Sequence, residues 1–265
     1  SMFGAWGPAT EDSIQGNMLH VRALDWIVNS PTNSYARVLV YHPEGQDLGH
    51  AYALWSWSGF VGAITGFSSA DVGVSEKLHG AGVYTRIGKP TTYVMRDVLN
   101  FDTTVQGAVD RLFQSRRTNS CWLGIGDGKD FEIVAYHHLP PQIYDYANFT
   151  VRHAPMDHVM WLHGDNAQNR CYQYYSTKYY GKITAELLIR VFVPGNKTGP
   201  THVAVFDYAK RYMYISSASP ADASGHSIPA WARPYTRIDL NAAFNFPAPK
   251  KSEDSFELNF DLGIQ

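Results

Sequence analysis

The order of secondary-structure patterns along the chain is the feature that most narrows its fold. Residues 1–84 read as strands, because β-branched and aromatic residues dominate short runs that glycines separate. The hydrophobic period then changes to three-and-four spacing, which predicts helices over 91–101 and 103–115, and strands resume at residue 121. Strands, then helices, then strands again, without strict alternation, favour an α+β layered fold over a doubly wound parallel sheet.

The predicted strands are short and follow one another closely. They cover 2–6, 18–26, 36–41, 51–65, 72–76, 121–125, 131–136, 201–206 and 212–217. A further helix is expected over 184–193, stopped by Pro194-Gly195, and a polar, proline-containing tail from about residue 221 is expected to wrap the surface. We therefore expect a single domain over 1–265, with antiparallel sheets inside and helices packed outside.

Composition excludes several classes of protein. With 45% hydrophobic and 17% charged residues, the 265-residue chain is too apolar for intrinsic disorder and long enough to bury a large core. Its formal net charge of -2 argues against nucleic acid as a partner, and no apolar run approaches the roughly 20 residues of a membrane span. The 11 histidines form no recognisable pattern of metal ligands, so no metal or organic cofactor is expected.

Two cysteines and two glycosylation sequons bear on the cellular compartment. Cys121 and Cys171 are too few for a disulfide framework, and they fit either one bridge or two buried thiols. The acceptor asparagines Asn148 and Asn196 each precede a threonine by two positions. Because the chain also does not start with methionine, it resembles a processed product. We expect a secreted or lysosomal protein, with a bacterial periplasmic or cytoplasmic one as the alternative.

Two glycine-containing motifs are poor matches to known catalytic signatures. Residues 124–128 resemble a nucleotide-binding loop, but they join two predicted strands and no helix follows, which favours a hairpin turn. Residues 66–70 resemble the nucleophile elbow of serine hydrolases, with Ser68 as the nucleophile. That motif requires a strand that leads directly into a helix, whereas residues 71–76 read as another strand. An elbow hydrolase that uses Ser68 is kept as an alternative.

The start of the chain carries a different candidate for chemistry. Ser1, with its small nucleophilic side chain, heads an apolar strand, and the next strand carries Arg22 and Asp25. A terminal nucleophile can use its own α-amino group as the general base, since the unperturbed pKa of that amine is about 7.7–8.0. Asp25 could then hold the ammonium or the hydroxyl, while Arg22 could orient charge or a substrate carbonyl. In an ordinary strand, Arg22 and Asp25 would instead pair with each other.

These residues resemble the start of the N-terminal-nucleophile hydrolases of the choloylglycine hydrolase, acid ceramidase and penicillin acyltransferase-like group. The resemblance rests on the order and spacing of blocks at 1–7, 16–26, 59–66, 72–76, 117–120, 180–184 and 201–207. It implies a four-layer αββα sandwich of two antiparallel sheets flanked by helices. It also implies an enzyme that cleaves a linear non-peptide amide through a covalent acyl-enzyme, either as a hydrolase or as an acyltransferase.

The resemblance assigns roles to individual residues. Arg22 and Asp25 would flank the nucleophile and its amine, and Asn119 would donate a hydrogen bond to the oxyanion, with the segment at Ser68 as a looser candidate for a second donor. The group begins with cysteine, where this chain has Ser1. Three explanations stay open: Ser1 replaces that cysteine, a cysteine directly precedes Ser1, or Ser1 is itself the nucleophile. The second fits best, because members of the group often start with Cys-Ser-x-Phe.

The substrate and partners follow from the same resemblance. Trp55, Trp57 and Phe60, on the strand predicted over 51–65, are candidates for an acyl pocket, or else they fill the core between the sheets. The chain would arise by autocatalytic cleavage of a longer precursor, whose propeptide could remain as a small subunit, and a homo-oligomer is compatible with this. The acyl amide stays open among fatty acyl amides, bile-salt conjugates, β-lactam precursors and amino-acid amides. An inactive relative that binds lipids or a partner protein is the rival interpretation.

Overall fold

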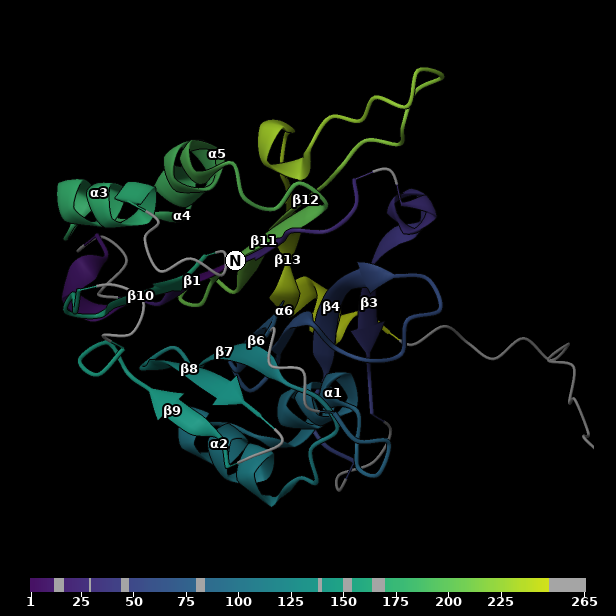
Figure 1. Ribbon diagram of the computed structural model, residues 1–265, viewed down its shortest axis with the longest axis vertical. Coiled ribbons are helices and arrows are strands. Elements are labelled where there is room, and N and C mark those ends of the chain that lie inside the picture. Colours follow the sequence, from purple (N-terminus) through teal and green to yellow (C-terminus); the bar gives the residue numbers. More distant parts are fainter. Residues whose placement is uncertain are drawn as a thin grey trace, which may run out of the picture.

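Two antiparallel sheets lie face to face at the centre of the molecule, and helices cover the outer face of each (Figure 1). The computed structural model describes residues 1–11, 17–28, 30–43, 48–79, 84–137, 140–149, 154–163 and 170–247. The expected four-layer αββα sandwich is confirmed.

The first sheet has six strands in the order β10-β1-β2-β11-β12-β13. Their bounds are β1 Met2–Ala5, β2 Leu19–Leu24, β10 Val159–Leu162, β11 His202–Asp207, β12 Tyr212–Ser217 and β13 Thr236–Asp239. On β2, Arg22 stands opposite Met2 of β1 on one side and Ala204 of β11 on the other. Because β2 is paired along both edges, its register is fixed from both sides.

The second sheet has seven strands, each hydrogen-bonded to the next in sequence, in the order β3-β4-β5-β6-β7-β8-β9. Their bounds are β3 Ala36–Tyr41, β4 Tyr52–Trp57, β5 Thr65–Ser68, β6 Gly73–Leu78, β7 Cys121–Gly126, β8 Phe131–Tyr136 and β9 Gln142–Tyr144. The chain leaves this sheet between β6 and β7 to form the two helices that cover it.

Different helices cover the two sheets (Figure 1). Those on the second sheet are α1 Thr91–Phe101 and α2 Val105–Gln114. The first sheet is covered by α3 Arg170–Tyr179, α4 Ala185–Leu187, a π-helical turn Leu188–Phe192 and α5 Val193–Asn196, while α6 Leu240–Asn245 follows β13. Short 3-10 helices lie at Gly7–Ala9, Pro31–Tyr35 and Ala230–Ala232. Among the described helices, none combines the length and the apolar character that crossing a bilayer requires.

Three apolar layers hold the sandwich together, and consecutive residues of a strand belong to different layers. Met2 packs between the two sheets, whereas Phe3 packs under the helices of the first sheet, and both are fully buried. A third layer, which includes Val98 and Leu99, lies under α1 and α2. The alternation of strand side chains therefore decides whether a residue of β1 faces the second sheet or the helices.

Several predicted elements agree closely with the structure, and others differ for identifiable reasons. The helix predicted over 91–101 has the bounds of α1, and the strands predicted over 36–41 and 131–136 have those of β3 and β8. The single strand predicted over 51–65 is wrong: it divides into β4 and the start of β5, and the segment that holds Phe60 is a turn between them.

Two further differences concern predicted elements in the second half of the chain. The helix predicted to stop before Pro194 continues to Asn196, and the proline directly follows the π-helical turn Leu188–Phe192 in a backbone that stays right-handed helical. Part of the expected surface tail belongs to the fold, since β13 pairs with β12 and Leu240 of α6 is fully buried. Residues 248–265 lie outside the described part of the chain.

Candidate active site

Ser1 stands at the head of β1, opposite Ala23 of β2. Its nitrogen donates to the carbonyl oxygen of Ala23 at 2.5 Å, and the nitrogen of Ala23 donates to the carbonyl oxygen of Ser1 at 2.9 Å. Two such reciprocal bonds are those of a hydrogen-bonded pair in an antiparallel ladder. Ser1 thus takes an ordinary strand position, and its side chain points away from that of Met2.

The side chain of Ser1 faces the helices rather than the second sheet. Its hydroxyl oxygen lies 2.6 Å from Oγ1 of Thr198 and 2.5 Å from Nδ1 of His163. Thr198 follows α5 along the chain, and His163 follows β10. Phe3, the next β1 residue on this face, packs against Phe192 of the π-helical turn. Ser1 therefore belongs to a polar cluster on the helix-covered side of the first sheet.

Asp25 lies beside both the nitrogen and the hydroxyl of Ser1, each 3.2 Å from its Oδ2. The backbone N–H of Gly199 donates to the other carboxylate oxygen at 2.7 Å. Burial alone would raise the pKa of Asp25, but the Ser1 ammonium and the Gly199 N–H bond outweigh it and lower this pKa to about 2. Burial also lowers the pKa of the Ser1 amine to about 5, against the opposing effect of Asp25. With Ser1 as the first residue, the site thus holds a weakly basic amine against an ionised carboxylate, whereas a residue before Ser1 would turn this nitrogen into a peptide N–H.

Arg22 and Glu76 form an ion pair across the space between the two sheets. Nη2 of Arg22 lies 3.4 Å from the carboxylate of Glu76, and the arginine is only 1% exposed. Among the described residues, Nε of Arg22 has no hydrogen-bond partner. A buried guanidinium with a single carboxylate partner at this distance retains capacity to bind another anionic or carbonyl oxygen.

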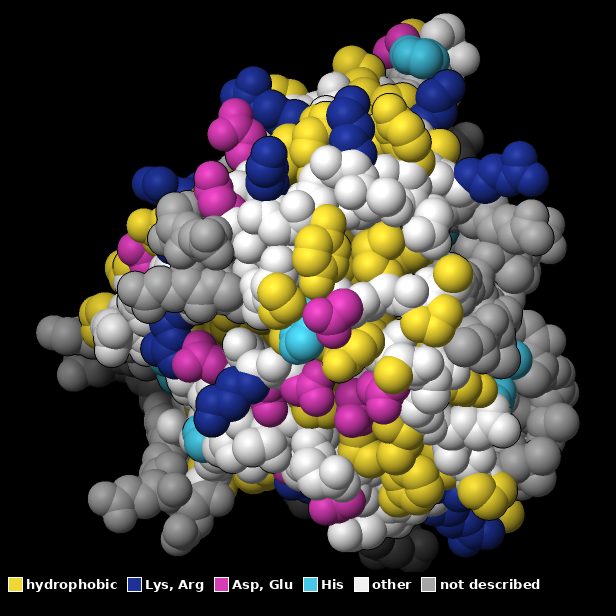
Figure 2. All heavy atoms as spheres, turned by 90° about the vertical axis from the view of Figure 1, so that its left-hand side faces the viewer, with side chains coloured by type: hydrophobic (Ala, Val, Ile, Leu, Met, Phe, Trp, Pro, Cys, Tyr) yellow, Lys and Arg dark blue, Asp and Glu magenta, His cyan; other side chains and the backbone are white. Residues whose placement is uncertain are grey.

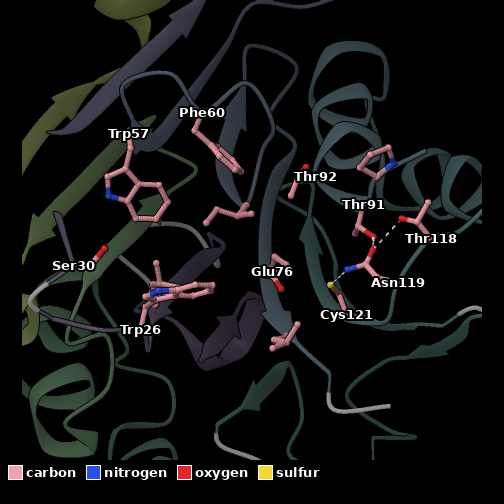
Figure 3. A pocket seen from close by; sticks show the side chains of 14 residues that line it. Trp26, Ser30, Trp57, Phe60, Glu76, Thr91, Thr92, Thr118, Asn119 and Cys121 are labelled. Atoms are coloured by element: carbon pink, nitrogen blue, oxygen red, sulfur yellow. Dashed lines mark hydrogen bonds between the residues drawn. The ribbon is translucent and has the colours of Figure 1, made fainter. Parts of the chain in front are cut away.

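An apolar pocket of about 540 Å³ opens beside this ion pair (Figure 3). It is lined by Leu24, Trp26, Ser30, Trp57, Phe60, Ile64, Glu76, Leu78, Pro90, Thr91, Thr92, Thr118, Asn119 and Cys121. In Figure 3, Trp26 and Trp57 lie on the opposite side from Asn119 and Cys121, with Glu76 between them. A mostly apolar cavity of this size with a few convergent polar groups is typical of a small-molecule site.

Hydrogen bonds to its oxygen fix the orientation of the Asn119 amide. Its Oδ1 accepts hydrogen bonds from the hydroxyls of Thr91 and Thr118, the latter at 3.2 Å. Its Nδ2 lies 3.3 Å from Sγ of Cys121, and sulfur is a weak acceptor. Burial and the nearby Glu76 raise the pKa of the Cys121 thiol, which therefore stays protonated. Asn119 thus presents a fixed N–H group to the pocket.

The candidate site residues predicted from the sequence lie in three places: the pocket, the core between the sheets and the surroundings of Ser1. Trp57, Phe60 and Asn119 line the pocket, while Trp55 lies in the core between the sheets. Arg22 pairs with Glu76 and Asp25 lies at Ser1, so the ordinary pairing of Arg22 with Asp25 is not the arrangement found.

Ser68 lies away from this pocket. It is fully buried, accepts a hydrogen bond from the nitrogen of Val72 at 3.2 Å, and is followed by β6 rather than by a helix. It pairs with Tyr52, at the other end of β4 from Trp57. Tyr52 and Trp57 are five residue steps apart along β4, which corresponds to roughly 17 Å.

Sequence reasoning assigned no role to Glu76, His163 or Thr198. Glu76 ends the Val-Ser-Glu block that supported the resemblance, but alternation puts it on the same face of β6 as Val74, which packs under α1 and α2, so the pattern does not point it at Arg22. His163 and Thr198 carry no local signal, because they reach Ser1 only through the pairing of β10 with β1 and the turn after α5. Among the described residues, no group of three or more His, Cys, Asp or Glu side chains is arranged to hold a metal ion.

The two cysteines differ in burial, and so do the two glycosylation sequons. The possible disulfide is not formed, since Cys121 is buried on β7 and Cys171 is exposed on α3. Asn148 is exposed in a turn, although Thr150 of its sequon lies outside the described residues. Asn196 is less accessible, because its Nδ2 donates to the carbonyl oxygen of Phe192 at 2.6 Å.

Solved structures share the fold of this chain. An N-acylethanolamine-hydrolyzing acid amidase ortholog from Caenorhabditis elegans superimposes with a TM-score of 0.58 at 16% identity, over 79% of this chain and 93% of that one. Penicillin V acylase from Agrobacterium tumefaciens gives 0.55 at 14% identity, over 94% of each chain. A single-residue variant of conjugated bile acid hydrolase from Clostridium perfringens gives 0.56 at 10% identity, over 90% of this chain and 92% of that one. At these identities the likeness establishes the fold.

Two curated proteins of Dictyostelium discoideum are more similar in sequence. Protein dcd1B is 31% identical over 83% of this chain, and protein dcd1A is 30% identical over 92% of it. The chain spans 45% of the length of the first and 60% of the length of the second. No protein-family model matches the chain.

Proposed function

We propose that this chain, whose fold is that of the N-terminal-nucleophile hydrolases, is the catalytic part of an amidohydrolase that cleaves linear N-acyl amides through a covalent acyl-enzyme. The proposed nucleophile is the side chain of a cysteine that directly precedes Ser1. Arg22, Asp25 and Asn119 complete the site, together with Glu76.

The direction of the β1 side chains carries the proposal. Met2 faces the second sheet and Ser1 faces the helices, so a residue directly before Ser1 would again face the second sheet. Continuing the ladder places that residue opposite Leu24, which lines the pocket, whereas Ser1 lines none of it. A nucleophile one residue ahead of Ser1 would thus point into the same space as Arg22 and Glu76. This geometry supports the second of the three explanations for the first residue.

The surrounding groups suit an acyl-transfer reaction. The thiol would attack the amide carbonyl while the α-amine of the same residue takes its proton. Asn119 Nδ2 would stabilise the oxyanion, and the amine would return the proton to the leaving nitrogen as the C–N bond breaks. Water, deprotonated by the same amine, would then hydrolyse the thioester and release the acid. Asp25, whose carboxylate lies 3.2 Å from the nitrogen of Ser1, would hold the peptide link between the nucleophile and Ser1 and thereby fix the position of the amine.

The pocket supports an apolar acyl group as the part of the substrate that it binds. Trp26, Trp57 and Phe60 present aromatic surface to it, and its polar groups gather on the side of Asn119. The carbonyl would therefore lie near Asn119 and the apolar chain against the tryptophans. An amine in place of water at the acyl-enzyme would make the same site an acyltransferase.

The proposed nucleophile requires a free α-amine, and we propose that autocatalytic cleavage of a longer precursor exposes it. A propeptide retained as a small subunit would be its by-product. We also propose a secreted or lysosomal location, which the exposed Asn148 would suit as a glycan acceptor.

The test is to express the full-length precursor and to determine the mass of its N-terminal peptides before and after treatment with an electrophilic acyl analogue. We expect a new terminus at the residue before Ser1, covalent modification of that residue, and release of free acid from N-acyl amides. A terminus that is cleaved but not modified would indicate the ligand-binding relative instead. Modification at Ser68 would favour the elbow hydrolase, and an uncleaved precursor would overturn the mechanism.

A further inference from the structure

We propose that Thr198 is a positioning residue. This rests on the proposed function, because Thr198 acts through Asp25, whose carboxylate lies 3.2 Å from the nitrogen of Ser1, on the residue directly before Ser1 that would carry the nucleophile and its α-amine. Thr198 and Gly199, which follow α5, both contact the Asp25 carboxylate. We call Thr198, Gly199 and Ser1 the Asp25 clamp.

The clamp places several donors around one carboxylate. Thr198 Oγ1 lies 3.2 Å from both oxygens of Asp25, and Gly199 donates its N–H at 2.7 Å. The same threonine hydroxyl is 2.6 Å from the hydroxyl of Ser1, which in turn contacts Nδ1 of His163. Thr198 is fully buried, so no water replaces these contacts. Contacts from the chain itself therefore fix the orientation of a carboxylate that is also partly exposed to solvent.

The backbone after α5 is shaped to bring this turn against Asp25. Lys197 ends the helix in the left-handed conformation, with φ +49°. Gly199 has φ +75°, and a Cβ atom there would lie 2.5 Å from Cγ2 of Val203 and 2.9 Å from Cβ of Ala23. Only glycine fits this close approach to β2. The close approach is what allows its N–H to reach the carboxylate.

A second contact extends the clamp along the same segments. The nitrogen of Thr201 donates to the carbonyl oxygen of Leu24 at 3.2 Å, and the nitrogen of Trp26 donates to Oγ1 of Thr201 at 3.1 Å. Residues on both sides of Asp25 are therefore tied to the segment that begins with Thr198. Asp25 itself is 41% exposed, and without these ties its side chain would be free to turn toward solvent.

The consequence concerns the rate of the chemical step rather than substrate binding. Thr198 does not line the pocket, so its loss should not weaken binding of the acyl group. A carboxylate that no longer fixes the amine leaves the general base misplaced, and a displacement of about 1 Å costs on the order of 10²-fold in rate. Thr198 therefore acts on kcat and on self-cleavage.

The test compares Thr198→Val, which removes the hydroxyl at constant shape, with Thr198→Ser, which keeps it. Thr10→Val is the matched control, because Thr10 is also buried on the first-sheet side and donates to backbone carbonyls away from the site. Each protein is made as full-length precursor. The rate of self-cleavage, the unfolding temperature, and kcat and KM per acyl-labelled site are measured on an N-acyl amide.

We expect Thr198→Val to lower kcat per labelled site about 10- to 100-fold with KM within about twofold, and Thr198→Ser to restore most of the rate. Thr10→Val should lower the unfolding temperature without changing kcat per site. If Thr198→Val loses unfolding temperature but keeps the wild-type kcat per site, the clamp is merely structural and the proposal is overturned. A wild-type protein with no labelling or turnover would instead refute the proposed function on which it rests.

Discussion

Met2 and Arg22 stand opposite each other on adjacent antiparallel strands, and both side chains face the second sheet. Ser1 and Ala23, the next pair along the ladder, face the helices instead. Because side chains alternate along β1, Ser1 faces the helices, whereas the proposed nucleophile directly before it would face the second sheet.

The first prediction follows from this alternation. In the full-length precursor, replacement of the residue directly before Ser1 by alanine should abolish covalent labelling by an acyl analogue. Ser1→Ala removes a hydroxyl that faces the helices, so we expect it to keep labelling, with its rate reduced by no more than about tenfold. Mass spectrometry of the labelled N-terminal peptide distinguishes the two variants. Loss of labelling in Ser1→Ala, with an intact fold by circular dichroism, would make Ser1 the nucleophile.

The proposed oxyanion role of Asn119 predicts a loss of rate without a loss of binding. We expect Asn119→Ala to lower kcat by about 10²–10³-fold, as removal of one oxyanion donor does in other acyl-transfer enzymes. Steady-state kinetics on an N-acyl amide would measure this, with Asn245→Ala on α6 as an exposed asparagine control. A change confined to KM would assign Asn119 to substrate binding.

The aromatic side of the pocket predicts a dependence on acyl-chain length. Trp57→Ala should lower kcat/KM for a long-chain acyl amide by about 10- to 100-fold, because it removes apolar contact area that only a long chain covers. An acetyl amide should be affected by less than about threefold. Phe246→Ala, at an exposed aromatic residue outside the pocket, is the control for general effects. Equal losses for both amides would contradict an acyl-binding role for Trp57.

Figure 2 shows acidic side chains gathered on one face of the molecule. Three acidic residues also act on Glu132. Burial, followed by the charges of Asp130, Asp145 and Asp127, raises the pKa of Glu132 to about 7 from 4.5. The folded state therefore holds this proton more tightly than the unfolded chain. The resulting stability is fully present below pH 4.5 and is lost as the pH rises through 7.

Glu132→Gln removes the titrating group, so it should stabilise the protein above pH 7 and leave it nearly unchanged at pH 4. After a discount for partial exposure, we expect about 1–2 kcal/mol at pH 8. Thermal unfolding at both pH values measures this, and Glu186→Gln, on the exposed surface of α4, is the control. A pH-independent effect of Glu132→Gln would show that its pKa is not raised.

The two sequons should differ in glycan occupancy if the protein passes through a secretory pathway. Asn148 is exposed, whereas the Asn196 amide is bonded within the end of α5 and Thr198 of its sequon is buried in the Asp25 clamp. We expect N-glycosidase treatment of protein secreted from eukaryotic cells to remove a glycan from Asn148 alone. Asn148→Gln should abolish the mass shift and Asn196→Gln should leave it unchanged. A glycan at Asn196 alone would reverse this assignment.

Elements with a local sequence signal could be predicted, and elements without one could not. α1 and α2 bury residues at helical spacing, and Thr104 caps α2 by accepting from the nitrogen of Gly107. In contrast, α3 buries only Tyr172 and Ser176 among its 10 residues, so it shows no apolar stripe. β10 has four residues and is defined by its pairing with β1, which the sequence does not display.

The same distinction applies to the site. Arg22, Asp25 and Asn119 lie within blocks whose order could be read along the chain. Their partners, Glu76 and Thr198, meet them only after the sheets and the turn following α5 are in place. Trp57 and Trp55 are two residues apart on one strand and share a face, yet only Trp57 reaches the pocket. Periodicity therefore gives the face of a residue but not its distance from the mouth of a cavity.

The ion pair between Arg22 and Glu76 joins a residue of the first sheet to one of the second, and Asn119 also belongs to the second-sheet half of the molecule. Neither half alone contains a complete set of proposed catalytic groups. The rate of turnover would therefore depend on how the two halves pack against each other. A variant that loosens their contact while each sheet keeps its strands should lose turnover before its far-ultraviolet spectrum changes.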